Sequence, residues 1–186
     1  MHMSQVDFNN VSATSSLGEL GPTTSLQLMF AKLQLELAET AKTQAMDKMD
    51  AIATAQDEQK LVSQLLNEAR QAQADGNSGT GVGMTSINGV TVTGKDCYPM
   101  SQEMVDYMDA HKLAYPNGDG DYILGKDEWD VAITSLESRL EELGTNTQQE
   151  MVYVQDYMGQ YNSYLQGANT QIANSNQTLT NLARGQ

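Results

Sequence analysis

Apolar residues recur at alternating spacings of three and four along the last third of the chain, and this repeat constrains the fold most strongly. The repeat comprises Met151, Val154, Met158, Tyr161, Leu165, Ala168, Ile172, Ser175, Leu179 and Leu182. A heptad sustained over about five repeats is typical of a long helix that packs lengthwise against another helix. The same spacing begins upstream, at Ile133, with a four-residue stutter near Thr147. The sequence therefore predicts a long C-terminal assembly helix over residues 129–186.

A second long helix is predicted over residues 23–75, because no glycine or proline interrupts that stretch. Large apolar residues share one face at its start, namely Leu26, Met29, Phe30, Leu33 and Leu37. Further along, the stripe narrows to alanines, which let another helix approach closely. The sequence therefore predicts an all-α fold, a long antiparallel coiled-coil helical hairpin.

The remaining segments predict a tail and a small insert. Residues 1–22 are rich in Ser, Thr, Asn and Gly, which indicates a flexible N-terminal tail. Residues 76–128 predict an exposed insert between the long helices. Within the insert, Asn88-Gly89 lies between two β-prone runs and indicates a short β-hairpin. Ser101 is placed to cap a short helix that ends near His111, and a loop rich in Asp and Gly follows.

The charge of the chain is strongly acidic and unevenly placed. There are 24 acidic residues against 10 basic ones, a formal net charge of -14. This balance argues against nucleic acid and anionic membrane as partners, because binding to either depends on Lys and Arg. Residues 157–183 contain no charged side chain and are rich in Gln and Asn. Since exposed coiled coils usually carry charged flanks, this uncharged face predicts a helix surrounded by copies of itself. The alternatives are a polar surface without charge and a frayed C-terminus.

One loop has the oxygen spacing of a calcium site. Oxygen side chains fall at positions 1, 3, 5 and 12 of an EF-hand loop, at Asn117, Asp119, Asp121 and Glu128. Leu124 fills the apolar position 8, but Tyr122 stands at position 6, where the sharp turn needs glycine. Asn117 also replaces the usual aspartate. The alternative is an acidic turn that favours the N-terminus of the next helix. Calcium is thus a secondary hypothesis, and no other cofactor is predicted.

We expect no enzymatic activity. His111 has no Ser/His/Asp or Cys/His arrangement near it in the sequence, so it is interpreted as a capping or surface residue. Cys97 is the only cysteine, which excludes an internal disulfide, and Lys95 is its only basic neighbour. No glycine-rich phosphate loop precedes a helix. No stretch is apolar enough to span a membrane, and no cleavable export signal is recognised at the N-terminus.

A family likeness is carried by three stretches: residues 28–31 (LMFA), 100–108 (MSQEMVDYM) and 118–133 (GDGDYILGKDEWDVAI). They resemble the apolar opening of the first helix, the short middle helix and the turn into the last helix of one family. That family is the EspA/SseB/EseB-type filament proteins of bacterial type III secretion systems. The layout of residues 26–182 is similar to theirs, although the hairpin at Asn88-Gly89 and the fuller Asp/Asn loop depart from the family pattern.

The resemblance implies a secreted structural subunit that a dedicated cytosolic chaperone holds before export through the type III secretion system. It implies polymerisation through the first and last helices into an extracellular filament on the bacterial surface. Such a filament links the needle to the translocation pore and conducts effectors into host cells, so further copies, needle proteins and translocator pore proteins are the implied partners. The heptad residues and the apolar face that begins at Leu26 would make the polymer contacts. Two alternatives stay open, a calcium-responsive helical binding module and a needle-tip cap that closes into a small ring.

Overall fold

The computed structural model describes residues 26–94 and 96–185, and the predicted tail at residues 1–22 lies outside this part of the chain. The helices are α1 (Leu26–Asn77), α2 (Gln102–Ala110) and α3 (Lys126–Arg184). The strands are β1 (Met84–Thr85), β2 (Thr91–Val92), β3 (Cys97–Pro99) and β4 (Ile123–Gly125). Most of the described residues are helical, as the sequence predicts. The structure ends α1 two residues beyond the predicted boundary and begins α3 three residues before it.

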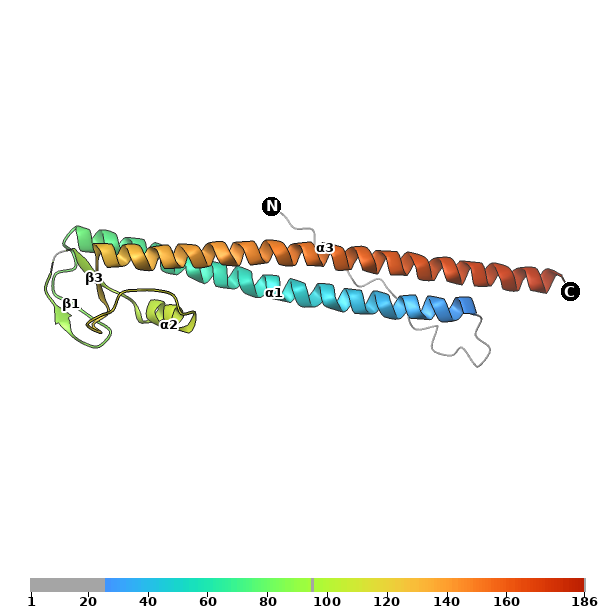
Figure 1. The fold of residues 1–186 in the computed structure, drawn as a ribbon, viewed down its shortest axis with the longest axis horizontal. Coiled ribbons are helices and arrows are strands. Elements are labelled where there is room, and N and C mark those ends of the chain that lie inside the picture. The colour runs from blue at the N-terminus through green and yellow to red at the C-terminus, as the bar shows by residue number, and fades with distance from the viewer. Residues whose placement is uncertain (1–25, 95, 186) are drawn as a thin grey trace. The chain divides into compact units, whose positions relative to one another are not determined.

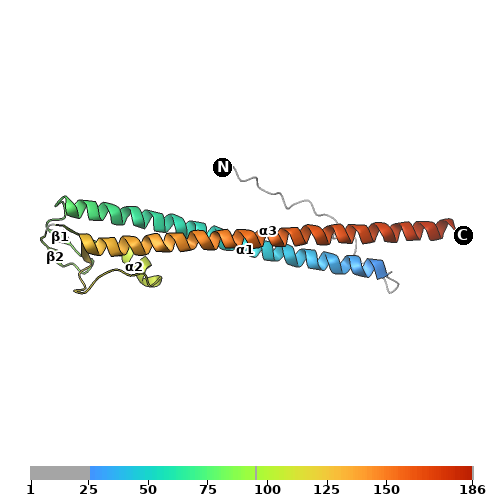
Figure 2. The ribbon, with the colours of Figure 1, turned by 45° about the horizontal axis from the view of Figure 1, so that its top comes forward.

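The long helices α1 and α3 pack against each other and run in opposite directions. In the second of two compact units, residues 48–152, three ion pairs join the helices: Lys48–Glu150, Glu58–Arg139 and Arg70–Glu137. Residue numbers rise along α1 while those of the partners fall along α3, so the pairing is antiparallel. The first unit, residues 1–47 and 153–186, holds the other segments of both helices. Within each unit α1 and α3 lie side by side (Figures 1 and 2).

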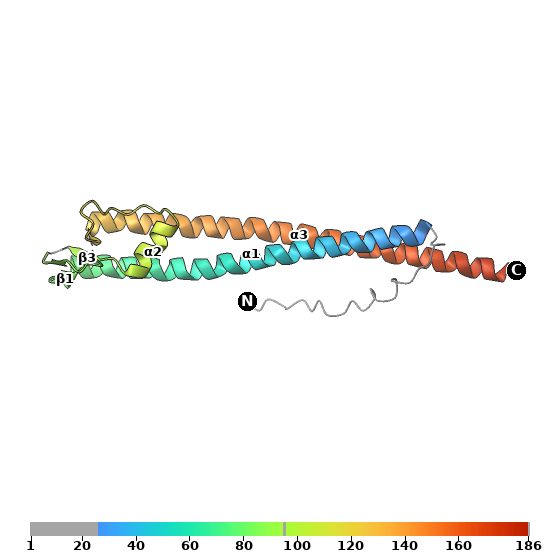
Figure 3. The ribbon, with the colours of Figure 1, turned by 90° about the horizontal axis from the view of Figure 1, so that it is seen from below.

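The apolar core lies in the second unit. Its largest fully buried side chains come from both long helices, α2 and β4: Trp129, Leu65, Met104, Met108, Leu124, Leu136 and Val62. Figure 3 shows α2 lying against the two long helices of this unit. The Ser101 side chain accepts a hydrogen bond from Met104 N and caps α2, as predicted. Burial of each such side chain contributes about 1.5–3 kcal/mol to stability. Because Met104 and Met108 of α2 belong to this core, α2 adds a third layer to the pair of long helices.

The insert contains two small antiparallel ladders, one of which the sequence predicts. β1 pairs with β2 through Met84 and Val92, and Gly89 in the connecting turn has φ 76°. The second ladder pairs β3 with β4, so that Tyr98 lies opposite Leu124. These strands are three residues each and stand far apart in the sequence. Because no turn signal joins them, the local sequence does not predict this pairing.

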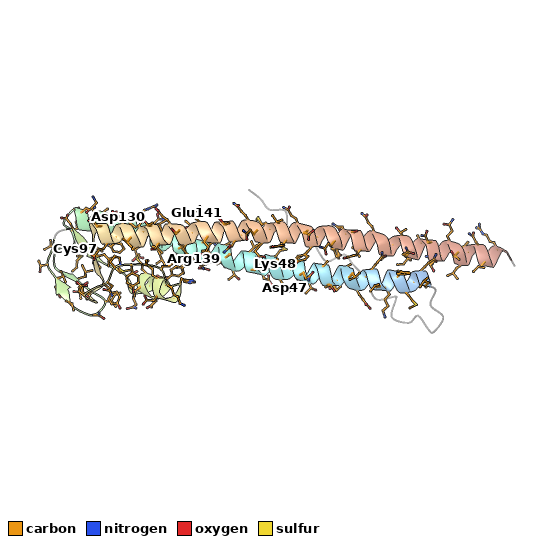
Figure 4. All side chains as sticks on the ribbon, in the orientation of Figure 1. Asp47, Lys48, Cys97, Asp130, Arg139 and Glu141 are labelled. Atoms are coloured by element: carbon orange, nitrogen blue, oxygen red, sulfur yellow. The ribbon has the colours of Figure 1, made fainter. Side chains whose placement is uncertain are left out.

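A polar cluster joins all three helices in the second unit. One oxygen of Glu58 on α1, Oε1, accepts hydrogen bonds from Tyr107 Oη on α2 at 2.7 Å and from Arg139 Nη2 on α3 at 2.7 Å. Arg139 also donates to Glu142 at 2.8 Å, and Figure 4 labels Arg139 on α3. His111 is the C-cap of α2, and its Nδ1 lies 3.7 Å from Glu58 Oε1. The cluster thus fixes α2 against both long helices.

The cluster holds Glu58 in its ionised form. Burial alone would raise the pKa of Glu58, but hydrogen bonds from Tyr107 and Arg139 and the charge of Arg139 lower it below the ordinary 4.5. Burial together with the bond to Glu58 raises the pKa of Tyr107 to about 12. Tyr107 therefore stays protonated and donates to Glu58 throughout the neutral range.

We predict that Glu58→Gln lowers the free energy of unfolding by about 2 kcal/mol near neutral pH, because hydrogen bonds to a charged acceptor are lost. Since folding lowers the pKa of Glu58, its stabilisation is present above pH 4.5 and is lost as the pH falls through the folded-state pKa. Urea unfolding followed by circular dichroism should therefore show wild type and variant converging in acid. Glu141→Gln, at an exposed position of α3, is the control and should change stability by less than about 0.5 kcal/mol. Equal stability of wild type and Glu58→Gln at neutral pH would contradict this account.

Candidate assembly surface

Large apolar side chains at the start of α1 remain exposed in the first unit. Their exposed fractions are 68% for Leu26, 58% for Met29, 48% for Phe30, 49% for Leu33 and 39% for Leu37. At 3.6 residues per turn these positions fall within an arc of about 100° on the helix. We call this surface the outer apolar face. Contiguous exposed apolar surface of this kind marks an interaction site in soluble proteins.

The buried side of α1 in the same unit carries alanines instead. Ala31, Ala38, Ala41 and Ala45 are at most 2% exposed, and Ala168 and Ser175 are buried on α3. The two helices are in contact here, because the end of the Gln34 side chain of α1 lies over Gly167 of α3, where an added Cβ would be 2.5 Å from Gln34 Nε2. We call this contact the alanine seam. Small side chains occupy the seam, and the large apolar side chains of α1 lie outside it.

The predicted heptad residues of α3 occupy three environments. Six are half-buried: Met151, Val154, Met158, Tyr161, Leu165 and Ile172. Ala168 and Ser175 are buried, whereas Leu179 and Leu182 are exposed. In an antiparallel helix pair, residues at equal distances before one contact residue and after the other lie opposite each other. Starting from the Gln34–Gly167 contact, this places Leu26 opposite about residue 175 of α3. Leu179 and Leu182 therefore lie past the described start of α1, where Figure 3 shows α3 extending beyond it.

Charge is divided unequally between the two units. Residues 48–152 contain 18 acidic and 7 basic residues, a net charge of -11. Residues 26–47 and 153–186 contain 4 acidic and 3 basic residues, a net charge of -1. The remaining 2 acidic residues belong to positions 1–25. The part of the chain that exposes the outer apolar face is thus almost neutral, and the part that holds the core is strongly acidic.

The Asp/Gly-rich loop forms a turn held by its own side chains. Asn117 Oδ1 accepts a hydrogen bond from Tyr122 N at 3.1 Å, and Asp121 Oδ1 accepts one from Ile123 N at 2.8 Å. Glu128 Oε2 accepts a hydrogen bond from Gly125 N at 2.8 Å. Tyr122 has φ 60°, so it adopts the left-handed backbone conformation that position 6 of an EF-hand requires. The lack of glycine at position 6 therefore does not prevent the backbone of Tyr122 from adopting the required conformation.

The predicted calcium ligands are not gathered around one point. Among residues 26–94 and 96–185, no group of three or more His, Cys, Asp or Glu side chains is arranged to hold a metal ion. Asn117, Asp121 and Glu128 instead accept backbone N–H groups, and Asp119 is exposed. Calcium binding by this loop would therefore require its carboxylates to turn inward.

The two side chains singled out for chemistry have structural surroundings. His111 caps α2 and packs on Tyr107, with ring centroids 4.3 Å apart. Cys97 lies in β3 and is half-buried, and burial with the nearby Asp121 and Asp96 raises the pKa of its thiol. A thiol with a raised pKa is a poor nucleophile at neutral pH. An enzymatic role gains no support from either residue.

Comparisons with protein-family models, with curated proteins and with solved structures found no match for this chain. The resemblance to the filament family therefore rests on residues 28–31, 100–108 and 118–133 and on the order of the elements. In the part of the chain that the structure describes, no helix is both long enough and apolar enough to cross a membrane.

Neighbouring substitutions in α1 should reveal which side of the helix is packed. Ala38→Leu is expected to destabilise the monomer by about 1–3 kcal/mol, because the seam has no room for a larger side chain. Leu37→Ala should cost less than about 0.5 kcal/mol, since exposed side chains contribute little to stability. Urea unfolding at a concentration low enough to keep the chain monomeric measures both effects. A larger loss of stability in Leu37→Ala than in Ala38→Leu would show that Leu37, and not Ala38, belongs to the packed side.

Proposed function

We propose that this protein is a non-enzymatic structural subunit that associates with further copies of itself through its first unit. The proposal is carried by the burial pattern of α1 in the first unit. There the small alanines are buried while the large side chains of Leu26, Phe30 and Leu33 are exposed. Each apolar Å² removed from water contributes about 25 cal/mol. The exposed part of the outer apolar face therefore contributes no burial in the isolated chain and would contribute stability once a second copy covers it.

The division of charge favours a second copy as the occupant of this surface. A partner that brings the same sequence brings the same charge, so a contact between acidic surfaces would be repulsive. Residues 26–47 and 153–186 of the first unit avoid this cost, because their net charge is -1 and residues 157–183 carry no charge. The net charge of -11 on the second unit keeps the free chain dispersed in water.

We further propose that the long helices form an antiparallel coiled coil. Two series of positions on α1, each with a period of seven, contain the buried residues Ala31, Ala38, Ala41, Ala45, Val62, Leu66 and Ala69. On α3, one such series contains Thr147, Ala168 and Ser175, which are all buried. A sustained period of seven supports coiled-coil packing. The fully buried Leu65 departs from the series and belongs to the core that also contains α2.

The biological setting that fits this subunit best is the extracellular filament of a type III secretion system. In that setting the chain is exported without a cleaved signal after release from a cytosolic chaperone. It then polymerises between the needle and the translocation pore. The family resemblance supports this setting, and the outer apolar face supplies a surface for the polymer contacts. The uncharged α3 segment at residues 157–183 would let copies lie close together.

One substitution on each unit tests the proposed contact. Leu33→Asp places a charge on the outer apolar face, whereas Val90→Asp places one on the hairpin of the second unit at nearly equal exposure, 49% against 48%. We expect Leu33→Asp to raise the concentration needed for association at least about tenfold, equivalent to about 1.4 kcal/mol. Val90→Asp should associate like wild type. High-speed pelleting and electron micrographs provide the measurement, with circular dichroism to confirm folding.

Normal filaments from Leu33→Asp would contradict the proposal. An equal loss of association in Leu33→Asp and Val90→Asp would contradict it as well. The needle-tip cap remains the nearest alternative, because a closed ring uses the same kind of contact between copies. Micrographs distinguish the two, since a cap gives closed particles of one size and a filament gives open polymers of increasing length.

A calcium-responsive binding module is the second candidate function. The observation that favours it is the left-handed backbone of Tyr122, which gives residues 117–128 the turn of an EF-hand loop without the usual glycine. Calorimetry with calcium should then give heat for wild type and none for Glu128→Gln, which removes a charge at the position 12 ligand. No heat from wild type at millimolar calcium would eliminate this module.

A further inference from the structure

One methionine lies on the outer apolar face. Among the described residues, three methionines are exposed: Met29, Met46 and Met49. Met29 has large apolar neighbours one turn away at Leu26 and Leu33. Met46 follows Leu37 by nine residues, which is two and a half turns, and so points to the opposite side of α1. Met29 is thus the exposed methionine whose chemistry bears on the proposed contact.

We propose that Met29 is an oxidation site that switches off association between copies, an inference that rests on the proposed function. The reagent class is a peroxide. The thioether sulfur of Met29 is oxidised by two electrons and gains one oxygen atom, the O–O bond breaks, and the peroxide is reduced to water or an alcohol. The product is methionine sulfoxide, which methionine sulfoxide reductases return to methionine.

The effect follows from the surroundings of Met29. A sulfoxide replaces an apolar thioether by a strong hydrogen-bond acceptor, and burial of an unpaired polar group costs free energy. In the free chain the sulfoxide is solvated, because Met29 is exposed. In the assembled state a second copy would cover it among Leu26, Phe30 and Leu33. Oxidation therefore opposes association while leaving the fold of the monomer unchanged.

Burial protects the methionines of the core from the reaction. Met104 and Met108 are fully buried in the second unit, and Met100 is nearly so. Their oxidation would require the core to open, whereas Met29 reacts in the folded chain. Association should in turn protect Met29, because the contact that needs its thioether also covers it. Met46, on the other side of α1, should lose less of its reactivity.

The test compares the full chain with Met29→Leu and Met46→Leu, before and after hydrogen peroxide. Each substitution replaces a methionine by an apolar side chain of similar size, and each variant is compared with its own untreated sample, so that any change in basal association is accounted for. Peroxide should raise the concentration needed for association about tenfold or more in wild type and in Met46→Leu. Met29→Leu should change less than about twofold. Mass spectrometry of peptides identifies the oxidised residues, and treatment with the reductase should restore association.

The outcomes separate this inference from the proposed function. Failure of the untreated chain to associate at any concentration would overturn both. Association that persists when mass spectrometry finds Met29 fully oxidised would overturn the inference alone. Equal sensitivity of Met29→Leu and wild type would also overturn it, since the switch would then reside in another residue. Loss of association in wild type and Met46→Leu, with resistance of Met29→Leu, is the supporting result.

Discussion

The alanine seam determines which side chains of the first unit are buried and which stay exposed. On α1, Ala31, Ala38 and Ala45 are buried in the first unit, and small side chains let two helices approach closely. The large apolar side chains of α1 in this unit, Leu26, Phe30 and Leu33 among them, are exposed instead. Alanine burial alone removes little apolar area from water, so the exposed outer apolar face is the part of this unit where a partner would add most burial. The proposed association between copies starts from this surface.

The second unit holds the apolar core of the described chain. Trp129, Leu65 and Leu136 form a conventional core with α2, and Glu58 joins three helices through a single carboxylate oxygen. This unit also holds most of the net charge. One unit therefore holds a core and most of the charge, whereas the described part of the other is nearly neutral and exposes large apolar side chains. If copies associate as proposed, attraction and repulsion lie in different parts of one chain, so ionic strength should modulate the association by screening the acidic unit.

Periodicity and turn chemistry were sufficient to predict the two long helices, the capped short helix and the hairpin at Gly89. Periodicity was insufficient to show which face of α1 is buried, because Leu33 and Ala38 belong to overlapping apolar stripes and only packing distinguishes them. The β3–β4 ladder and the bonds among Glu58, Tyr107 and Arg139 depend on contacts between distant parts of the chain, which no local pattern encodes. Residue type alone predicts an unfavourable turn at Tyr122, since glycine is usual there. The side chain of Asn117, which accepts the Tyr122 N–H, supports that conformation.

We propose that a second copy covers the large apolar residues that the first unit exposes in the single chain. Sedimentation velocity of the full chain across a wide concentration range, at low and at high salt, tests this most directly. The account predicts species that grow with concentration and form at lower concentration in high salt, because salt screens the acidic unit while the apolar contact persists. A single monomeric species at every concentration and salt level would contradict it.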